Sequence, residues 1–156
     1  MVLSAITLSL TRIEVNYMIY VTVQFMLLMF IGFPVGNIHF SLLGLLLVLV
    51  AAIIAILALS ANRLGNFNIR PVPKTEGKLI TSGIYMYIRH PMYSSLFFAG
   101  LGIVLFQLSI YKLIAWCFLV IILIFKARVE ENMLIKKYDG YQRYQEQTKR
   151  FIPYIY

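Results

Sequence analysis

The sequence predicts an all-helical, polytopic integral membrane protein, and three features of the chain support this prediction. Of its 156 residues, 61% are hydrophobic and only 13% are charged, whereas a soluble domain has roughly 45–50% apolar and about 25% charged residues. The apolar residues are gathered into runs long enough for transmembrane helices. The basic residues lie almost entirely on one side of these runs. At this length we expect one membrane domain over residues 1–156.

Four apolar runs predict about four transmembrane helices, arranged as two helical hairpins. A helix needs roughly 20 apolar residues to cross a hydrocarbon core of about 30 Å. The predicted spans cover residues 15–35, 40–60, 91–108 and 111–128. The last two share a stretch that is short for two full crossings, so we expect one or both to be short or tilted. The N-terminal run is also short and has no basic residue before it, which favours an interfacial helix over a cleaved signal peptide.

The distribution of Lys and Arg predicts the orientation of the spans. Cytoplasmic loops of membrane proteins carry the excess of basic residues. Of the fourteen Lys and Arg residues, Lys112 alone lies on the opposite side of the predicted spans. We therefore expect both termini, the loop 61–90 and the tail 129–156 in the cytoplasm. The membrane can be a plasma or inner membrane or the endoplasmic reticulum.

The first polar cluster lies where the central loop meets the third predicted span. Arg89 and His90 precede Pro91, and Tyr85 and Tyr93 flank them. Proline suits the first turn of a helix, which places Arg89 and His90 at the boundary between water and lipid. Tyr and Arg also serve as interfacial anchors, so an anchoring role is the alternative for this cluster.

The second polar cluster, Arg128, Glu130 and Glu131, follows the fourth predicted span. Adjacent carboxylates are unusual there, because anionic headgroups disfavour negative charge. They either pair with cations or bind one. Intrahelical pairing is one possibility, since Arg128 and Glu131 are three residues apart and Lys126 and Glu130 are four apart. Because both hairpins end on the cytoplasmic side, the two clusters can share one pocket.

Other polar residues and the single cysteine receive simpler interpretations. Asn16 and Gln24 in the first span and Gln107 in the third predict interhelical hydrogen bonds. Cys117 is the only cysteine and lies in an apolar run, which excludes a disulfide framework and a cysteine-ligated metal site. The net charge of +8 accompanies a membrane composition, so it does not indicate a soluble nucleic-acid binder.

Both polar clusters belong to a recognisable series of motifs. The series reads Gly83-x-Tyr85-x-x-x-Arg89-His90-Pro91-x-Tyr93, then Arg128-x-Glu130-Glu131-x-x-Leu134, then Gly140, Tyr144 and Arg150-Phe151-Ile152-Pro153. In this order it resembles the isoprenylcysteine carboxyl methyltransferase and phospholipid methyltransferase superfamily of integral membrane methyltransferases. The resemblance covers roughly residues 63–153. The chain departs from the usual pattern at Ile84, Met86 and Ser94-Ser95, which weakens an assignment to the carboxyl methyltransferase branch.

The resemblance implies an enzyme that transfers a methyl group from S-adenosylmethionine to a lipophilic acceptor. It assigns cofactor binding to Tyr85, His90, Tyr93 and Glu131. It assigns catalytic roles to Arg89, Arg128 and Glu130, and it implies no metal. These residue types suit the cofactor, whose sulfonium and ammonium need carboxylates, whose carboxylate needs a cation and whose adenine needs planar groups. The chain has no Gly-x-Gly-x-x-Gly after a candidate strand, which argues against a soluble Rossmann-type methyltransferase.

Several acceptors and two other functions stay open on the sequence alone. The acceptor can be an isoprenylcysteine carboxylate or related lipid, a phospholipid amine, or a hydrophobic thiol. A carboxylate would be oriented by Arg89 or Arg128, whereas an amine or thiol needs a glutamate or His90 to take a proton. The alternatives are a non-catalytic small polytopic protein with lipid-anchoring clusters and a sterol-type reductase, which the short chain disfavours. The expected partners are the bilayer and the lipophilic acceptor, with no nucleic acid.

Overall fold

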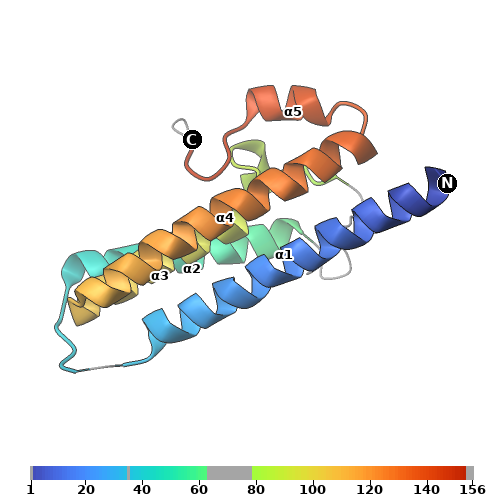
Figure 1. Ribbon diagram of the computed structural model, residues 1–156. Coiled ribbons are helices and arrows are strands. Elements are labelled where there is room, and N and C mark those ends of the chain that lie inside the picture. The colour runs from blue at the N-terminus through green and yellow to red at the C-terminus, as the bar shows by residue number, and fades with distance from the viewer. Residues whose placement is uncertain (1, 35, 63–78, 154–156) are drawn as a thin grey trace.

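The computed structural model describes residues 2–34, 36–62 and 79–153, and helices are the only regular secondary structure in these ranges (Figure 1). The elements are α1 (Val2–Gly32), α2 (Leu42–Ala61), the short 3₁₀ helix η2 (Gly83–Met86), α3 (Pro91–Gln107), α4 (Ile110–Lys137) and α5 (Tyr141–Gln147). The predicted all-helical class is therefore confirmed for the described part of the chain. Most of the predicted central loop, residues 63–78, lies outside the described residues.

The four long helices correspond to the four predicted spans, but two helix ends differ. α1 begins at Val2 rather than near residue 15, so the N-terminal run continues into the first predicted span and is not a separate interfacial helix. α4 continues to Lys137, well beyond the predicted end at residue 128. This extension places Glu130 and Glu131 on helical backbone.

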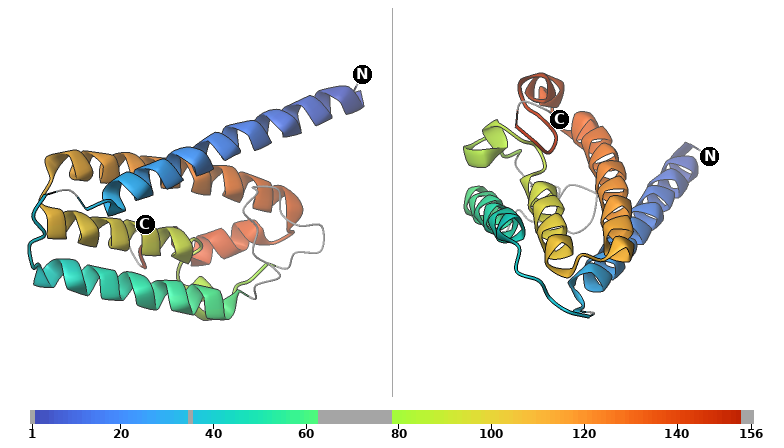
Figure 2. Two further views of the ribbon diagram at one scale, coloured as in Figure 1. Left: turned by 90° about the horizontal axis from the view of Figure 1, so that it is seen from below. Right: turned by 90° about the vertical axis from the view of Figure 1, so that its left-hand side faces the viewer.

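The four long helices form an open arc in the order α2, α3, α4, α1 (Figure 2). The predicted hairpin of the first two spans is wrong, because α2 packs along α3 whereas α1 packs mainly along α4. The segment between α1 and α2 crosses the end of α3, where the backbone N–H of His39 donates to the Phe106 carbonyl at 2.8 Å. The predicted hairpin of the third and fourth helices is confirmed, since α3 and α4 pack together.

Small residues explain why α2 pairs with α3. The buried residues of α2 are Gly44, Ala51 and Ala58, which recur every seven residues and therefore share one face. Gly44 lies against Gly102 of α3, where a Cβ atom on Gly102 would be only 2.8 Å from the Gly44 carbonyl oxygen. Small residues at such positions let two helix backbones approach closely, which is a common basis of helix packing in membranes.

The centre of the bundle is apolar. Ala115, Leu119 and Leu123 of α4 lie on one stripe and are almost fully buried. They pack against Ile31 of α1 and Val104 of α3. This cluster fixes the register of α4 against α1, and it therefore sets which residues meet at the two polar ends of the bundle.

A buried lysine lies at the end of the bundle that is remote from the polar clusters. Lys112 Nζ donates to the carbonyl oxygens of Ile31 (3.2 Å) and Phe33 and to the side-chain oxygen of Gln107. These carbonyls belong to the C-terminal end of α1, where a cation is favoured. Gln107 also donates to the Ile31 carbonyl at 3.2 Å, so its predicted interhelical hydrogen bond is confirmed.

Two of the long helices meet the requirements for a membrane span by themselves. α2 and α4 are long and apolar enough to cross a membrane, whereas the apolar part of α1 (Tyr17–Gly32) and α3 are shorter. The large apolar side chains of α2, including Leu46, Ile53 and Ile56, are mostly exposed. Such a surface suits contact with lipid tails. Four crossings stay a prediction.

Candidate active site

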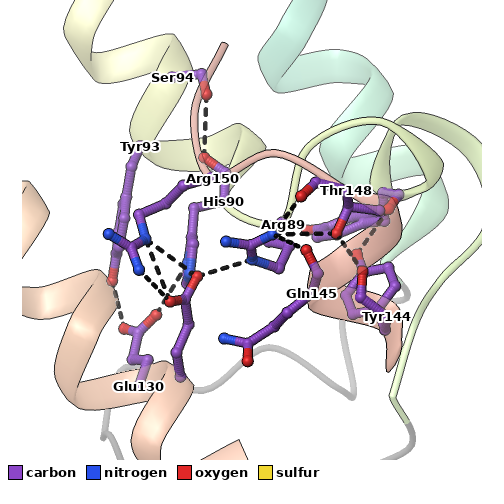
Figure 3. Close-up of polar contacts among 11 residues, drawn as sticks. Arg89, His90, Tyr93, Ser94, Glu130, Tyr144, Gln145, Thr148 and Arg150 are labelled. Atoms are coloured by element: carbon purple, nitrogen blue, oxygen red, sulfur yellow. Dashed lines mark hydrogen bonds and ion pairs between the residues drawn. The ribbon is translucent and has the colours of Figure 1, made fainter. Parts of the chain in front are cut away.

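The C-terminal tail folds back onto the segment before α3 and joins the two predicted polar clusters. Three backbone hydrogen bonds connect residues 87–90 with residues 149–150: Arg89 N to Lys149 O (2.8 Å), His90 N to Arg150 O (3.0 Å) and Lys149 N to Tyr87 O (3.0 Å). The hydroxyl of Ser94 in α3 donates to the carbonyl of Phe151 at 2.6 Å (Figure 3). The final motif of the sequence therefore lies directly beside the Arg-His-Pro motif.

Glu131 is the centre of a buried ion cluster. Its carboxylate accepts hydrogen bonds from Arg89 Nε at 2.8 Å and Arg150 Nη2 at 2.6 Å, and it lies 3.2 Å from Nε2 of His90. The Glu131 side chain is only 3% exposed. Burying a charge is costly unless it is paired and hydrogen-bonded, and here cations from the central loop and the tail supply this pairing.

Arg89 also ties the central loop to the tail (Figure 3). Its Nη1 donates to the carbonyl oxygens of Gln145 at 3.0 Å and Thr148 at 2.5 Å. The hydroxyl of Tyr144 in α5 donates to the carbonyl of Tyr85 at 2.6 Å and adds a second tie. Arg89 therefore holds α5 in place while Glu131 balances its charge.

Glu130 lies next to Glu131 in the sequence but has different surroundings. The hydroxyls of Tyr17 and Tyr93 donate to its Oε1, and its Oε2 lies 3.4 Å from Nδ1 of His90. Consecutive residues of a helix are separated by about 100°. One carboxylate therefore enters the ion cluster, whereas Glu130 faces a cavity.

His90 links the two carboxylates. Its Nδ1 faces Glu130, its Nε2 faces Glu131, and its ring stacks on Tyr93 with centroids 5.3 Å apart and planes 3° apart. Burial lowers the pKa of His90, but hydrogen bonds and attraction from the two carboxylates outweigh burial and raise the pKa above its ordinary value. His90 therefore stays positively charged over a wider pH range than a free histidine.

The tyrosines around the tail are packed into the structure. Tyr141 is 1% exposed, and its ring packs edge-on against Tyr144 with centroids 5.7 Å apart. Burial raises the pKa of the Tyr85, Tyr141 and Tyr144 hydroxyls. All three stay protonated near neutral pH, and the Tyr144 hydroxyl donates its hydrogen bond to the Tyr85 carbonyl.

A cavity of about 420 Å³ lies between α1, α3 and α4 beside Glu130. Its polar lining includes Tyr85, Arg89, His90, Tyr93 and Glu130. Its apolar lining includes Val21, Phe25, Leu28 and Leu96. The volume lies within the range of about 300–1,000 Å³ found for small-molecule sites. A cavity with one polar and one apolar end suits an amphipathic ligand or a pair of ligands of opposite character.

Six of the seven predicted site residues are brought together, and Arg128 is not. Tyr85, Arg89, His90, Tyr93 and Glu130 line the cavity, and Glu131 lies beside them in the ion cluster. The side chain of Arg128 is exposed and does not line the cavity. Because Arg128 and Glu130 are two residues apart, they point about 200° apart around α4. The predicted catalytic role of Arg128 has no support from these contacts.

Three further residues belong to the site although the sequence does not identify them. Tyr17 binds Glu130, and Lys126 Nζ donates to Gln24 Oε1 at 2.5 Å. This confirms the predicted interhelical hydrogen bond of Gln24. The spacing of Lys126 from Glu130 is a usable signal, since residues four apart share a helix face. Tyr17 has no comparable signal, because its neighbours depend on how α1 packs on α4.

The alternative of intrahelical ion pairs is not observed. The four ion pairs within the described ranges join the two glutamates to Arg89, His90 and Arg150. All three partners come from outside α4. The carboxylates are therefore used to connect segments that are distant in the sequence.

The sequence matches a known protein family. Residues 38–140 match the family described as phospholipid methyltransferase, and this match covers about two thirds of the chain. The matched range includes α2, α3, all of α4 and both glutamates. The chain therefore belongs to the phospholipid methyltransferase family, within the superfamily that its motifs resemble. A search of curated proteins gave no match.

Family membership gives a coarse functional class. It indicates a membrane methyltransferase that acts on lipid substrates. The apolar helices α2 and α4 agree with an integral membrane protein.

Proposed function

We propose that this protein transfers a methyl group from S-adenosylmethionine to a lipophilic acceptor that partitions into the membrane. The observation that supports this most directly is the cavity, which joins a polar end containing Tyr85, His90 and Glu130 to an apolar wall. A charged cofactor and a lipid tail need these two surroundings side by side. Isoprenylcysteine carboxylate-like lipids and phospholipid amines both belong to this class of acceptor.

The residues that line the cavity fit S-adenosylmethionine. Glu130 offers a carboxylate to its cationic groups, and His90 with Arg89 offers positive charge to its carboxylate. Tyr85 and Tyr93 offer planar groups to its adenine. The donor set therefore contains each type of group that the cofactor requires.

Glu131 has an indirect role in this proposal. It does not line the cavity, but it holds Arg89, His90 and Arg150 by ion pairs. We assign it to positioning of the cation groups rather than to direct contact with the cofactor.

The chemistry proposed for the site depends mainly on positioning. When bound, S-adenosylmethionine supplies an electrophilic methyl group on its sulfonium. The chain holds both reactants in the cavity, and fixed geometry of this kind contributes about 7–11 kcal/mol to catalysis in favourable cases. Tyr17 and Tyr93 orient the Glu130 carboxylate, and Glu130 is the cavity-lining group that can take the proton from an amine or thiol acceptor.

We also infer that all four long helices cross the membrane with both termini in the cytoplasm. The excess of basic residues at the end that holds the two clusters supports this orientation. The apolar wall of the cavity then lies at the depth of the lipid tails. The acceptor enters laterally between helices, and the cofactor enters from the cytoplasm.

Calorimetric titration of S-adenosylmethionine into the detergent-purified full-length protein tests the proposal. We expect saturable binding by the wild type and roughly tenfold or greater weakening in Glu130→Gln and His90→Ala, because each removes a charged hydrogen-bonding group. Glu146→Gln is the matched control, since Glu146 is exposed on α5. A reduced nicotinamide cofactor, titrated in parallel, should not bind.

Two results would contradict this proposal. Absence of S-adenosylmethionine binding by folded wild type, both in detergent and in lipid discs, would favour the non-catalytic anchoring alternative. Binding of the nicotinamide cofactor alone would favour a membrane reductase. Where the methyl donor binds, transfer of a labelled methyl group to fractionated membrane lipids identifies the acceptor.

A further inference from the structure

One cationic side chain of the cavity, that of Lys126, has no role in the function described so far. Lys126 lies on α4, four residues before Glu130, and lines the cavity although it is only 5% exposed. A lysine is rarely buried to this extent without an anionic partner. Its surroundings therefore indicate which kind of ligand group it can bind.

The partners of Lys126 are neutral. Its Nζ donates to Gln24 Oε1 at 2.5 Å and lies over the rings of Tyr93 and Tyr17, 4.9 Å and 5.3 Å from their centroids. None of the ion pairs in the described ranges includes Lys126. Glu130 attracts it from further away but is engaged by two phenols and His90. An aromatic and amide environment orients the ammonium without neutralising it.

The other side chain of the cavity lining with a permanent positive charge already has an ion-pair partner. Arg89 is paired with Glu131 through Nε, and its Nη1 donates to the carbonyls of Gln145 and Thr148 near the end of α5. Within the described lining of the cavity, Lys126 is therefore the cation that can accept an anionic ligand without breaking an existing ion pair.

The position of Lys126 indicates which ligand supplies the anion. Along α1 its partner Gln24 lies next to Phe25 and one turn before Leu28, and both of these side chains belong to the apolar lining. Glu130 and His90 lie on the other side of Lys126, toward the tail. Lys126 is therefore located where the polar end of the cavity changes to the apolar end, at the height expected for the headgroup of a lipid whose tail lies along α1.

We propose that Lys126, oriented by Gln24, binds an anionic group of the lipid acceptor, a phosphate or carboxylate close to the atom that receives the methyl group. This inference rests on the proposed function and adds a substrate requirement to it. The site selects an acceptor that carries an anionic oxygen group over an uncharged lipid with the same tails. Lys126 is a specificity-determining residue in this account, and Gln24 is a positioning residue.

A binding experiment tests this without measuring turnover. Dihexanoyl phosphatidic acid and uncharged dihexanoylglycerol are titrated into the full-length protein in a neutral maltoside detergent. We expect the wild type to bind phosphatidic acid more tightly than the diacylglycerol. Lys126→Gln should weaken phosphatidic acid binding roughly tenfold to hundredfold, the range for loss of a charged hydrogen bond. Lys126→Arg should keep most of the binding, and Lys136→Gln, an exposed charge change on the same helix, should have no effect.

A second variant keeps the test decisive if Lys126→Gln does not fold. Gln24→Glu retains Lys126 but places a carboxylate beside its ammonium, and this internal ion pair competes with an anionic ligand. We expect Gln24→Glu also to weaken phosphatidic acid binding by tenfold or more. Thermal unfolding without ligand shows for each variant that the fold is intact.

S-adenosylmethionine also carries a carboxylate, so Lys126 could bind the methyl donor instead of the lipid acceptor. A second set of titrations distinguishes these two ligands. S-adenosylmethionine and its decarboxylated analogue are titrated into the wild type and Lys126→Gln. Unchanged cofactor affinity together with lost phosphatidic acid binding supports the proposal. Weakened binding of the cofactor but not of its decarboxylated analogue would overturn it, because Lys126 would then bind the donor.

Failure of the inference and failure of the proposed function give different results. Unchanged phosphatidic acid binding in both Lys126→Gln and Gln24→Glu, with normal cofactor binding, overturns the role of Lys126 alone. Absence of cofactor binding by the wild type overturns the methyltransferase proposal, whereas the phosphatidic acid titrations still decide whether Lys126 binds anions.

Discussion

At the scale of single residues, two adjacent glutamates have separate tasks. Glu131 is surrounded by Arg89, His90 and Arg150, whereas Glu130 is bound by two phenols and faces the cavity. The first arrangement stabilises the folded chain, and the second leaves a carboxylate oriented toward a ligand. Substitution of the two residues should therefore affect stability and binding differently.

Glu131→Gln should strongly destabilise the protein. The substitution keeps the shape of the side chain but leaves buried cations without their counter-charge, which costs about 3–5 kcal/mol in comparable cases. Thermal unfolding in detergent measures this effect. Glu146→Gln, an exposed carboxylate on α5, is the control and should unfold as the wild type does. Equal unfolding temperatures for Glu131→Gln and the wild type would contradict the assigned role.

His90 should make stability depend on pH. Burial lowers its pKa, but Glu130 and Glu131 raise it above the ordinary value of about 6.5. Because the pKa of His90 is higher in the folded state, protonated His90 stabilises the fold. This stabilisation is fully present below the unfolded-state pKa of about 6.5 and is lost as the pH rises through the folded-state pKa. Unfolding temperatures measured from mildly acidic to alkaline pH should therefore fall more steeply for wild type than for His90→Gln. Parallel curves would exclude His90 as the source.

At the scale of secondary-structure elements, two kinds of contact decide the packing. Small residues let α2 and α3 approach closely, and hydrogen bonds attach the C-terminal tail to the rest of the bundle. α2 and α3 approach closely at Gly44 and Gly102. A Cβ atom added to either glycine would lie within 3.0 Å of the carbonyl oxygen of the other. The tail has no apolar helix of comparable length, and hydrogen bonds from Arg89 and Ser94 hold it instead.

Gly102→Ala should separate α2 from α3. Its Cβ would lie 2.8 Å from both the Gly44 carbonyl oxygen and Val48 Cγ2, so the backbones must move apart at a cost of about 1–3 kcal/mol. Thermal unfolding in detergent checks this expectation. Gly32→Ala is the matched control, because a Cβ at Gly32 would meet no atom within 4 Å. A similar loss in both variants would indicate a general effect of glycine replacement.

Arg89→Lys should release the tail although the charge is kept. A lysine ammonium cannot bind Glu131 and the carbonyls of Gln145 and Thr148 together as the planar guanidinium does. We expect faster chymotrypsin cleavage around Tyr141 and a stability loss of about 1–3 kcal/mol. Arg143→Lys, at an exposed position of α5, should be cleaved at the wild-type rate. Unchanged cleavage of Arg89→Lys would show that other contacts suffice to hold the tail.

At the scale of the whole molecule, charge and hydropathy define an axis. One end of the bundle carries both polar clusters and α5, and the other end carries the buried Lys112 and the connector between α1 and α2 (Figure 1). If all four long helices cross the membrane, these two ends lie on opposite sides. The cavity then starts at the cytoplasmic surface and extends among lipid-facing helices.

Cysteine labelling tests this orientation. In a Cys117→Ala background, Asn37→Cys reports on the connector and Gln142→Cys on α5, and both positions are exposed. With a membrane-impermeant maleimide and sealed membranes of known orientation, we expect Asn37→Cys and Gln142→Cys to be labelled from opposite sides, with Gln142→Cys on the cytoplasmic side, because basic residues favour that side. Labelling of both positions from the same side would contradict three crossings by α2, α3 and α4, because an odd number of crossings places the two positions on opposite sides.

Much of the site can be predicted from the sequence because its signals are local. The Arg-His-Pro motif and the paired glutamates are recognisable from residue type and spacing, and hydropathy places both near the same end of the predicted spans. This reasoning brings Tyr85, His90, Tyr93 and Glu130 to one site, as the structure shows. The same reasoning does not remove Arg128 from the site. To do so, one must know which face of the fourth helix meets the neighbouring helices, and the sequence does not give this.

The sequence by itself determined the helical class, the approximate helices, the family and most of the polar residues of the site. The tertiary structure alone decided that α3 and α4 lie between α2 and α1, that the tail pairs with the segment before α3, and that Tyr17, Gln24 and Lys126 reach the cavity. The physical reason is that helices surrounded by lipid are apolar on nearly every face. Their hydrophobic pattern therefore does not reveal which face meets another helix, and that choice depends on close packing between segments distant in the chain.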